Sequence, residues 1–191
     1  MARARSNRPK DCPYVGKGGL KLAYALDRLE LEVAGAVAAD LGCHVGGFTD
    51  CLLQRGAARV YAVDTGYGIL AWKLRTDPRV VVCERTNALH WRPPEPLQLV
   101  CSDLGWTRQE LALPAIAGML APGGQALSLV KPQYELGARP PRGVVAEDQI
   151  PQVLERVRAA CPPELEIAHL LESPYRGSGG NPEFWLHAVR R

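Results

Sequence analysis

The stretch Ala36–Leu53 reads AVAADLGCHVGGFTDCLL and predicts a buried strand, a tight turn and a helix that starts near Gly47. The continuous apolar run that leads to Asp40 is typical of a strand buried on both faces. The glycines at 42, 46 and 47 let the backbone turn sharply and approach a ligand closely. In open α/β sheets such a turn lies at the carboxyl edge of the strands, where ligands bind. We therefore expect a small-molecule site at this turn.

Three further apolar runs also end in a charged residue: RVYAVD ends at Asp64, LQLVCSD at Asp103 and QALSLVK at Lys131. Strands that alternate with helices predict a doubly wound, Rossmann-like α/β fold with helices on both faces of the sheet. All strand-to-helix loops then open at one edge of the sheet, so the charged strand ends meet there. Because buried charge is costly unless it is paired or used, we interpret these strand ends as functional.

The remaining segments complete an expected sheet of seven mostly parallel strands. Helices are predicted after Gly18-Gly19 and over 68–75, 108–120 and 149–161, and further strands over 80–84, 165–171 and 183–189. The sequence APGG at 121–124 is expected to end one helix, and the fifth strand is expected to start at Gln125. A glycine-rich turn at 173–182 predicts an antiparallel hairpin, so that the last strand runs antiparallel to the others.

Length and composition indicate one domain, over 14–191, that follows a basic arm over 1–13. The 191 residues carry a net charge of +3, which is compatible with a polyanionic partner. The arm either contacts RNA or is merely solvated. A long loop over 136–146, which contains Arg139 and Arg142, is interpreted as functional.

Cysteine usage and hydropathy exclude several classes of protein. The six cysteines form no C-x-x-C pair, and we expect reduced, buried thiols rather than a disulfide framework or a metal site. No apolar stretch approaches the ~20 residues of a membrane span, and no signal peptide is evident. We therefore expect a soluble protein in the cytoplasm, with no membrane contact.

The glycine loop lacks the dinucleotide fingerprint, because Cys43, His44 and Val45 separate Gly42 from the next glycine. This spacing argues against a nicotinamide oxidoreductase. The loop instead resembles the first motif of S-adenosylmethionine-dependent methyltransferases. The predicted cofactor-binding residues are Asp40, Gly42, Cys43, His44, Gly46, Gly47, Phe48, Asp64, Asn87 and Asp103.

Two of these residues have specific expected partners in the cofactor. Asp64 lies roughly 20 residues after the glycine loop, the spacing at which an acid binds ribose hydroxyls, although a helix cap is the alternative. Asn87 follows the third strand at the same edge of the sheet, where we expect an adenine contact.

Several segments extend this likeness over nearly the whole chain from Tyr14 onward. YVGKGGLKLAYAL, DLGCHVGGFTDCLLQRGAARVYAVDTGYGILAWKLR, VVVCERTNA, LAPGGQALSLVKPQYE and GNPEFW resemble the hemolysin-A-like (TlyA) branch of the FtsJ-like RNA ribose methyltransferases. The resemblance implies S-adenosylmethionine as cofactor and transfer of its methyl group to a ribose 2′-OH of RNA, with ribosomal RNA the usual target.

The same resemblance implies a catalytic tetrad of Lys21, Asp103, Lys131 and Glu183, with Glu135 as the alternative acid. Methyl transfer to a hydroxyl needs the oxygen held close to the methyl group and relieved of its proton. We assign Lys131 as the principal lysine, with the other three orienting it and the ribose. Whether Lys131 is a base or a positioning group is left open at this point.

The chain also departs from the family pattern. Members usually carry a small N-terminal RNA-binding domain, and only about a dozen basic residues precede the core here, so a partner protein that supplies RNA targeting is one hypothesis. Asp103 is followed by Leu-Gly-Trp rather than Val-Ser-Phe, and Trp106 either stacks on a nucleobase or packs. His44 either contacts the cofactor or fills the loop. A non-catalytic RNA-binding module, or a methyltransferase that acts on a base or a protein, remains the alternative function.

Overall fold

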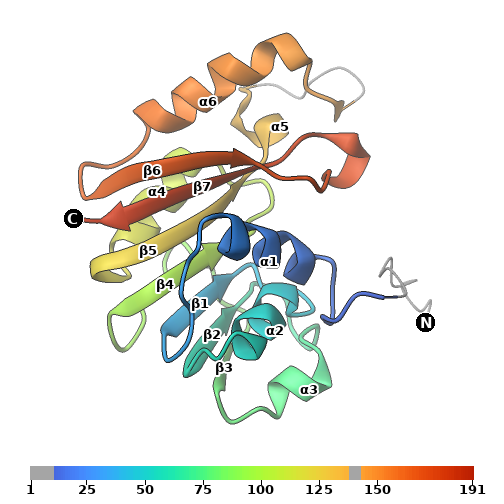
Figure 1. Cartoon of the computed structure of the whole chain (residues 1–191), viewed down its shortest axis with the longest axis vertical. Coiled ribbons are helices and arrows are strands. Elements are labelled where there is room, and N and C mark those ends of the chain that lie inside the picture. Colours follow the sequence, from blue (N-terminus) through green and yellow to red (C-terminus); the bar gives the residue numbers. More distant parts are fainter. Residues whose placement is uncertain (1–10, 138–142) are drawn as a thin grey trace.

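The computed structural model describes residues 11–137 and 143–191, which form a twisted seven-stranded sheet flanked by helices (Figure 1). The strand order is β3-β2-β1-β4-β5-β7-β6. The strands are β1 (Val37–Leu41), β2 (Arg59–Val63), β3 (Val80–Cys83), β4 (Leu97–Ser102), β5 (Leu120–Val130), β6 (Leu165–Glu172) and β7 (Phe184–Arg190). Most of the predicted basic arm, together with Arg139 and Arg142, lies outside the described residues.

Strand directions confirm the predicted topology. β1 pairs in parallel with β2 and β4, β2 with β3, and β4 with β5. β7 is antiparallel to both of its neighbours, β5 and β6. The carboxyl ends of the parallel strands and the start of β7 therefore share one edge of the sheet, where Val130 pairs with Phe184.

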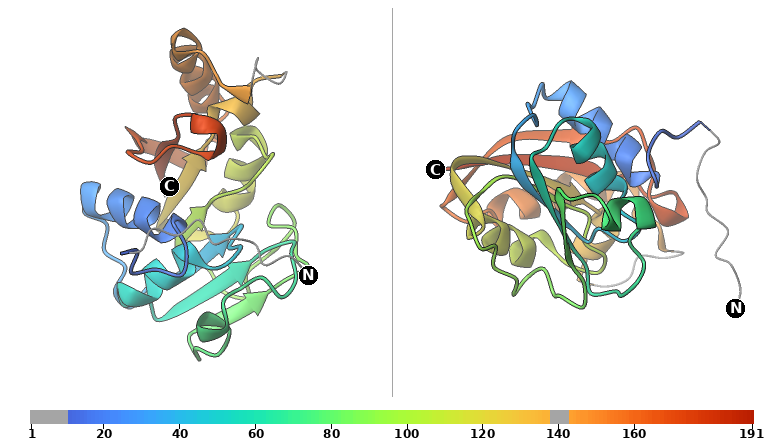
Figure 2. Two further views of the ribbon diagram at one scale, coloured as in Figure 1. Left: turned by 90° about the vertical axis from the view of Figure 1, so that its right-hand side faces the viewer. Right: turned by 90° about the horizontal axis from the view of Figure 1, so that it is seen from below.

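Helices cover both faces of the sheet, and each face has its own apolar core. α1 (Gly18–Arg28), α2 (Gly47–Gln54) and α3 (Trp72–Arg75) pack on one face, around buried residues that include Leu26, Phe48 and Trp185. α4 (Gln109–Ala117) and α6 (Ile150–Ala159) pack on the other face, around Ile116 and Val157. Figure 2 shows α1 and α4 on opposite sides of β5. The short α5 (Pro132–Glu135) follows β5, and a 3-10 turn (Glu147–Gln149) leads into α6.

Several boundaries differ from those expected. The helix predicted over 68–75 forms only from Trp72, and the helix predicted over 108–120 ends at Ala117. β5 begins at Leu120 rather than Gln125, because Leu120 already pairs with Leu97 of β4 and the ladder resumes after an irregularity. The sequence APGG at 121–124 therefore lies inside β5, whereas it was expected to end the preceding helix.

Two further expectations concern the cysteines and the membrane. Cysteines 12, 43, 51 and 101 are buried, as predicted, whereas Cys83 and Cys161 are only partly buried. No helix within residues 11–137 and 143–191 has the length and hydropathy needed to cross a membrane.

Candidate active site

The glycine loop after β1 adopts a backbone that a side chain would disrupt. Gly42 has a φ of +84°, and a Cβ there would lie 2.7 Å from the carbonyl oxygen of Asp103. Gly46 has a φ of +95°, and a Cβ there would meet Leu70 and Leu74. Both positions therefore require glycine for two reasons, the left-handed backbone and the close approach of a neighbour.

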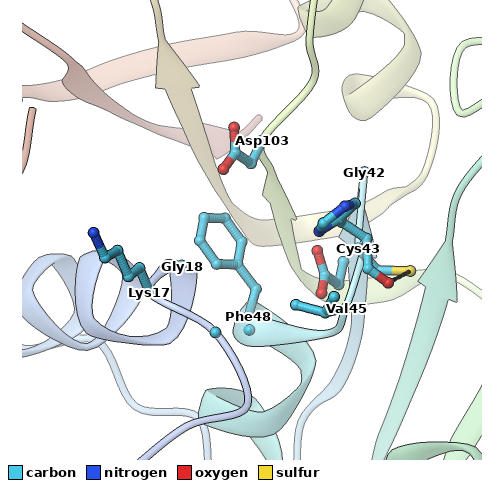
Figure 3. A pocket seen from close by; sticks show the side chains of 11 residues that line it. Lys17, Gly18, Gly42, Cys43, Val45, Phe48 and Asp103 are labelled. Atoms are coloured by element: carbon cyan, nitrogen blue, oxygen red, sulfur yellow. Dashed lines mark hydrogen bonds between the residues drawn. The ribbon is translucent and has the colours of Figure 1, made fainter. Parts of the chain in front are cut away.

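This loop and the start of α1 line a cavity at the carboxyl edge of the sheet (Figure 3). The loop brings Gly42, Cys43, His44, Val45 and Gly47 to its wall, and α2 adds Phe48. Asp40, Asp103, Gly16, Lys17 and Gly18 complete the lining. Seven of the ten residues predicted to bind the cofactor thus line one cavity, namely Asp40, Gly42, Cys43, His44, Gly47, Phe48 and Asp103.

Asp40 is buried at the end of β1 and ties the strand to α2. Its Oδ2 accepts hydrogen bonds from the Thr49 backbone N–H at 2.9 Å and from the Thr49 hydroxyl at 2.7 Å. Because Gly46 has no side chain to cap α2, Asp40 satisfies one of the helix's unpaired N–H groups. Burial raises the pKa of Asp40 to about 7, although the Thr49 hydrogen bonds oppose the shift.

Asp64 and Asn87 hold the loops at the edge of the sheet. Asp64 accepts backbone hydrogen bonds from His44 at 2.8 Å and from Gly66 at 2.7 Å. Each of its oxygens keeps a second lone pair, so the predicted ribose contact stays a prediction that the geometry allows. Asn87 accepts a hydrogen bond from the Leu89 N–H at 2.9 Å, and neither it nor Asp64 is among the described residues that line the cavity.

Phe48, Cys43 and His44 differ in their surroundings. The Phe48 ring is buried, lies at the cavity in Figure 3 and packs against Trp185 with ring centroids 5.5 Å apart. Cys43 is buried, and burial raises the pKa of its thiol, so it is an inert wall rather than a nucleophile. His44 is exposed, with a left-handed φ of +49°. Its side chain therefore borders the mouth of the cavity.

The four residues of the predicted tetrad come together as two ion pairs at the same edge. Lys131 follows β5 and pairs with the carboxylate of Asp103, which follows β4. Lys21, near the start of α1, pairs with Glu183 at 2.5 Å, just before β7. Only 14% of each lysine side chain is exposed. Ion pairs with so little solvent around them are screened only weakly by salt.

Glu183 shows that the two pairs act on each other. Burial raises the pKa of its carboxyl, while Lys21 lowers it most strongly among the neighbouring charges. Asp103 and Lys131 also contribute, which places both near the carboxylate. A Cβ on Gly177 would lie 2.5 Å from Glu183 Oε1, so only glycine leaves this carboxylate its position.

The alternative acid, Glu135, has another task. Its Oε1 accepts a hydrogen bond from the Gln109 backbone N–H at 3.0 Å, at the start of α4. Burial raises the pKa of this carboxyl. Glu183, and not Glu135, is therefore the acid that forms an ion pair with a lysine of the tetrad.

A buried polar network beneath the site was not foreseen. The Ser102 and Ser128 hydroxyls lie 2.7 Å apart, and Ser128 donates to Gln109 Oε1 at 2.8 Å. These groups connect the ends of β4 and β5, the strands that carry Asp103 and Lys131, to α4. Serine inside an otherwise apolar strand was the available signal, because buried hydroxyls require partners.

The sequence also does not predict that the segment before α1 packs on the glycine loop. The carboxylate of buried Asp50 accepts a hydrogen bond from the Val15 backbone N–H at 2.8 Å and pairs with Lys73. A Cβ on Gly47 would lie 2.9 Å from the Gly19 nitrogen, so the segment packs directly on the glycine loop. Glycines around Lys17 in YVGKGG were the signal for this close approach.

The residues at this edge fit S-adenosylmethionine. Glycines that exclude any Cβ form one wall, and carboxylates of Asp40 and Asp103 face a space suited to the cationic end of that molecule. The apolar wall of Phe48 and Cys43 supplies the remaining contact surface.

The fold and this site define a methyltransferase of the S-adenosylmethionine-dependent class, as predicted. Distant solved structures that share the fold alone include enzymes described in those terms. The model of the FtsJ-like methyltransferase family matches residues 14–190. The chain belongs to the FtsJ-like methyltransferase family, and the resemblance found in the sequence is confirmed.

Individual relatives agree with this assignment. YqxC of Bacillus subtilis, named as an rRNA methyltransferase, is 41% identical over 91% of this chain and 65% of its own length. The 16S/23S rRNA (cytidine-2′-O)-methyltransferase TlyA of Mycobacterium tuberculosis is 42% identical over 91% of this chain and 67% of its own. The chain thus spans about two thirds of these relatives. A solved Streptococcus thermophilus protein described as a hemolysin superposes with a TM-score of 0.90, at 39% identity over 96% of this chain and 69% of that one.

Proposed function

We propose that the chain transfers a methyl group from S-adenosylmethionine to a ribose 2′-OH of ribosomal RNA. The observation that carries the proposal is the meeting of the Lys21–Glu183 and Lys131–Asp103 pairs beside the glycine-lined cavity. Two ammonium groups and two carboxylates at one edge suit a reaction that must orient a hydroxyl and remove its proton.

Each residue of the tetrad has its own role in the proposed reaction. Bound S-adenosylmethionine supplies an electrophilic methyl group. The 2′-oxygen would form a bond to the methyl carbon as the carbon–sulfur bond breaks and its electron pair stays on sulfur, and the hydroxyl proton would pass to water. Lys131 holds the 2′-oxygen, and Asp103 fixes the direction of the Lys131 ammonium. Lys21 and Glu183 bound the place of the acceptor ribose on the side opposite the Lys131–Asp103 pair.

The surface beside Lys131 suits a nucleobase. The Trp106 side chain is 83% exposed and has a left-handed φ of +58°. Its ring lies 4.9 Å from that of Tyr134, and the Lys131 ammonium lies 5.8 Å from the Tyr134 ring centroid. The exposed Trp106 ring, packed on the half-buried Tyr134 next to Lys131, supports stacking of the acceptor base at Trp106.

Relatives support ribosomal RNA as the substrate, because two of them that match 91% of the chain carry rRNA methylation in their names. Exposed Arg85 and Arg92 are the cations that we propose for phosphate contacts. The proposal includes a cytoplasmic location, where such RNA is assembled into ribosomes. A partner protein that supplies RNA targeting, and an RNA contact by the basic arm over 1–13, belong to the same proposal.

The proposal is tested with radiolabelled S-adenosylmethionine, deproteinised ribosomal RNA and intact ribosomal subunits, followed by digestion to nucleosides. We expect label in a 2′-O-methylated nucleoside. Glu183→Gln, which keeps the shape but removes the charge, serves as the matched variant and should lose most of the transfer. A methylated base, or no transfer by a protein that binds S-adenosylmethionine, would contradict the proposal.

A further inference from the structure

Lys17 differs from the other lysines that the structure describes. Lys21, Lys73 and Lys131 each pair with a carboxylate. Lys17 is exposed and makes no ion pair within residues 11–137 and 143–191, yet it lines the glycine-loop cavity. Figure 3 shows it at the start of α1, across Phe48 from the Gly42–Cys43 turn. Its ammonium points away from Phe48 in this view, and because it has no carboxylate of its own it is available to turn toward an anion in the cavity.

The backbone of Lys17 is held firmly although its side chain is not. Gly19 N–H donates to the Gly16 carbonyl at 3.1 Å, and Leu20 N–H donates to the Lys17 carbonyl at 3.1 Å. Gly47 packs against this turn. The lysine backbone therefore keeps its place relative to the glycine loop, while its exposed side chain is free to turn toward a ligand in the cavity.

The charges around the cavity match one end of S-adenosylmethionine. That end carries two cations, the sulfonium and the α-ammonium, and one anion, the α-carboxylate. Among the described residues, the cavity is lined by two acids, Asp40 and Asp103, and by Lys17 as its one lysine or arginine. Asp40 uses Oδ2 for Thr49, and no described residue donates to its Oδ1. Asp103 also pairs with Lys131, so a ligand cation would share its carboxylate. Lys17 is the lining cation without a carboxylate of its own, which leaves it for the α-carboxylate of the ligand.

We propose that Lys17 binds the α-carboxylate of the cofactor and makes the site select nucleosides that carry it. The inference rests on the proposed use of S-adenosylmethionine and adds the residue that recognises its acid group. A charged hydrogen bond of this kind contributes roughly 10- to 150-fold in affinity. Lys17 is four residues before Lys21, so one turn of α1 carries both the cofactor contact and a tetrad lysine.

Calorimetric titration with two ligands tests the proposal. S-adenosylmethionine and its decarboxylated form, S-adenosylmethioninamine, differ only in the carboxylate. In wild-type protein the decarboxylated ligand should bind about 10-fold or more weakly. Lys17→Met should weaken S-adenosylmethionine by a similar factor and leave the decarboxylated ligand within about threefold, whereas Lys17→Arg should keep the preference.

Arg28→Met is the matched control, because it removes one positive charge from the exposed far end of the same helix. It should change neither affinity. Equal weakening of both ligands by Lys17→Met, or no weakening of either, would overturn the assignment of Lys17 while leaving the proposed function intact. Unchanged cofactor affinities with weaker RNA binding would instead assign Lys17 to an RNA phosphate. Wild-type protein that binds neither ligand would overturn the proposed function and this inference together.

Discussion

Gly42→Ala provides a sharp test of the glycine loop, because two separable effects act at this position. A φ of +84° costs an alanine about 1–2 kcal/mol relative to glycine. The new Cβ would also lie 2.7 Å from the Asp103 carbonyl oxygen, a backbone atom that has to move. Overpacking of this kind costs about 1–3 kcal/mol. We therefore expect the free energy of unfolding to fall by about 2–5 kcal/mol in total.

Two other glycines separate these effects. Gly35 has a φ of +74°, but nothing lies within 4 Å of the position that an alanine Cβ would take, so Gly35→Ala should lose only about 1–2 kcal/mol. Gly118 has an ordinary φ of −71°, and Gly118→Ala should be neutral or gain about 0.4–1 kcal/mol. Equilibrium urea denaturation followed by tryptophan fluorescence measures all three.

The function of Gly42→Ala should change with its stability. Movement of Asp103 alters the cavity wall, so affinity for S-adenosylhomocysteine should fall in Gly42→Ala and stay unchanged in Gly35→Ala. If Gly42→Ala is no less stable than Gly35→Ala, or binds the nucleoside equally well, the close approach of the Asp103 carbonyl is not what requires glycine here.

Three further outcomes are expected. Burial raises the pKa of Asp40 from 3.8 to about 7, so the native state holds this proton more tightly than the unfolded chain does, and the stability that this provides is lost as the pH rises from 3.8 to about 7. In Asp40→Asn the free energy of unfolding, measured with urea, should therefore depend less on pH within this range. An unchanged pH dependence would refute this prediction. Gly177→Ala should displace Glu183 and lower kcat about 100-fold with unchanged S-adenosylhomocysteine affinity, and an unaltered kcat would show that this carboxylate is not held by the glycine. Trp106→Ala should weaken RNA binding about 5- to 150-fold in filter binding, with Trp106→Phe intermediate, and equal RNA affinity of all three proteins would exclude base stacking there.

Sequence reasoning succeeded where a local pattern determines the structure. The apolar run before Asp40 and the following glycines specified β1, the turn and α2, because continuous burial and a left-handed backbone leave few residue types possible. The charged ends of consecutive parallel strands specified one edge of the sheet. These features depend on residues that are close together in the sequence, so a single sequence is enough to predict them.

Other features depended on contacts distant in sequence. The helical pattern around Lys21 assigns it no role. Only the family resemblance implies one, and the structure then pairs it with Glu183, 162 residues later in the chain. β5 starts early because β4 offers a partner at Leu97, which overrides the turn preference of APGG. Lys17 and the Ser102–Ser128 contact carry no periodic signal, since their surroundings arise from packing between separate elements.

The proposed function depends most on the Lys131–Asp103 pair at the edge of the sheet. The most direct measurement is the single-turnover rate of methyl transfer to ribosomal RNA by Lys131→Met, with S-adenosylhomocysteine affinity measured on the same protein. We predict a rate at least about 100-fold below wild type with affinity within about threefold. A rate near that of wild type, in a variant that still binds the nucleoside, would show that Lys131 is not needed for the transfer.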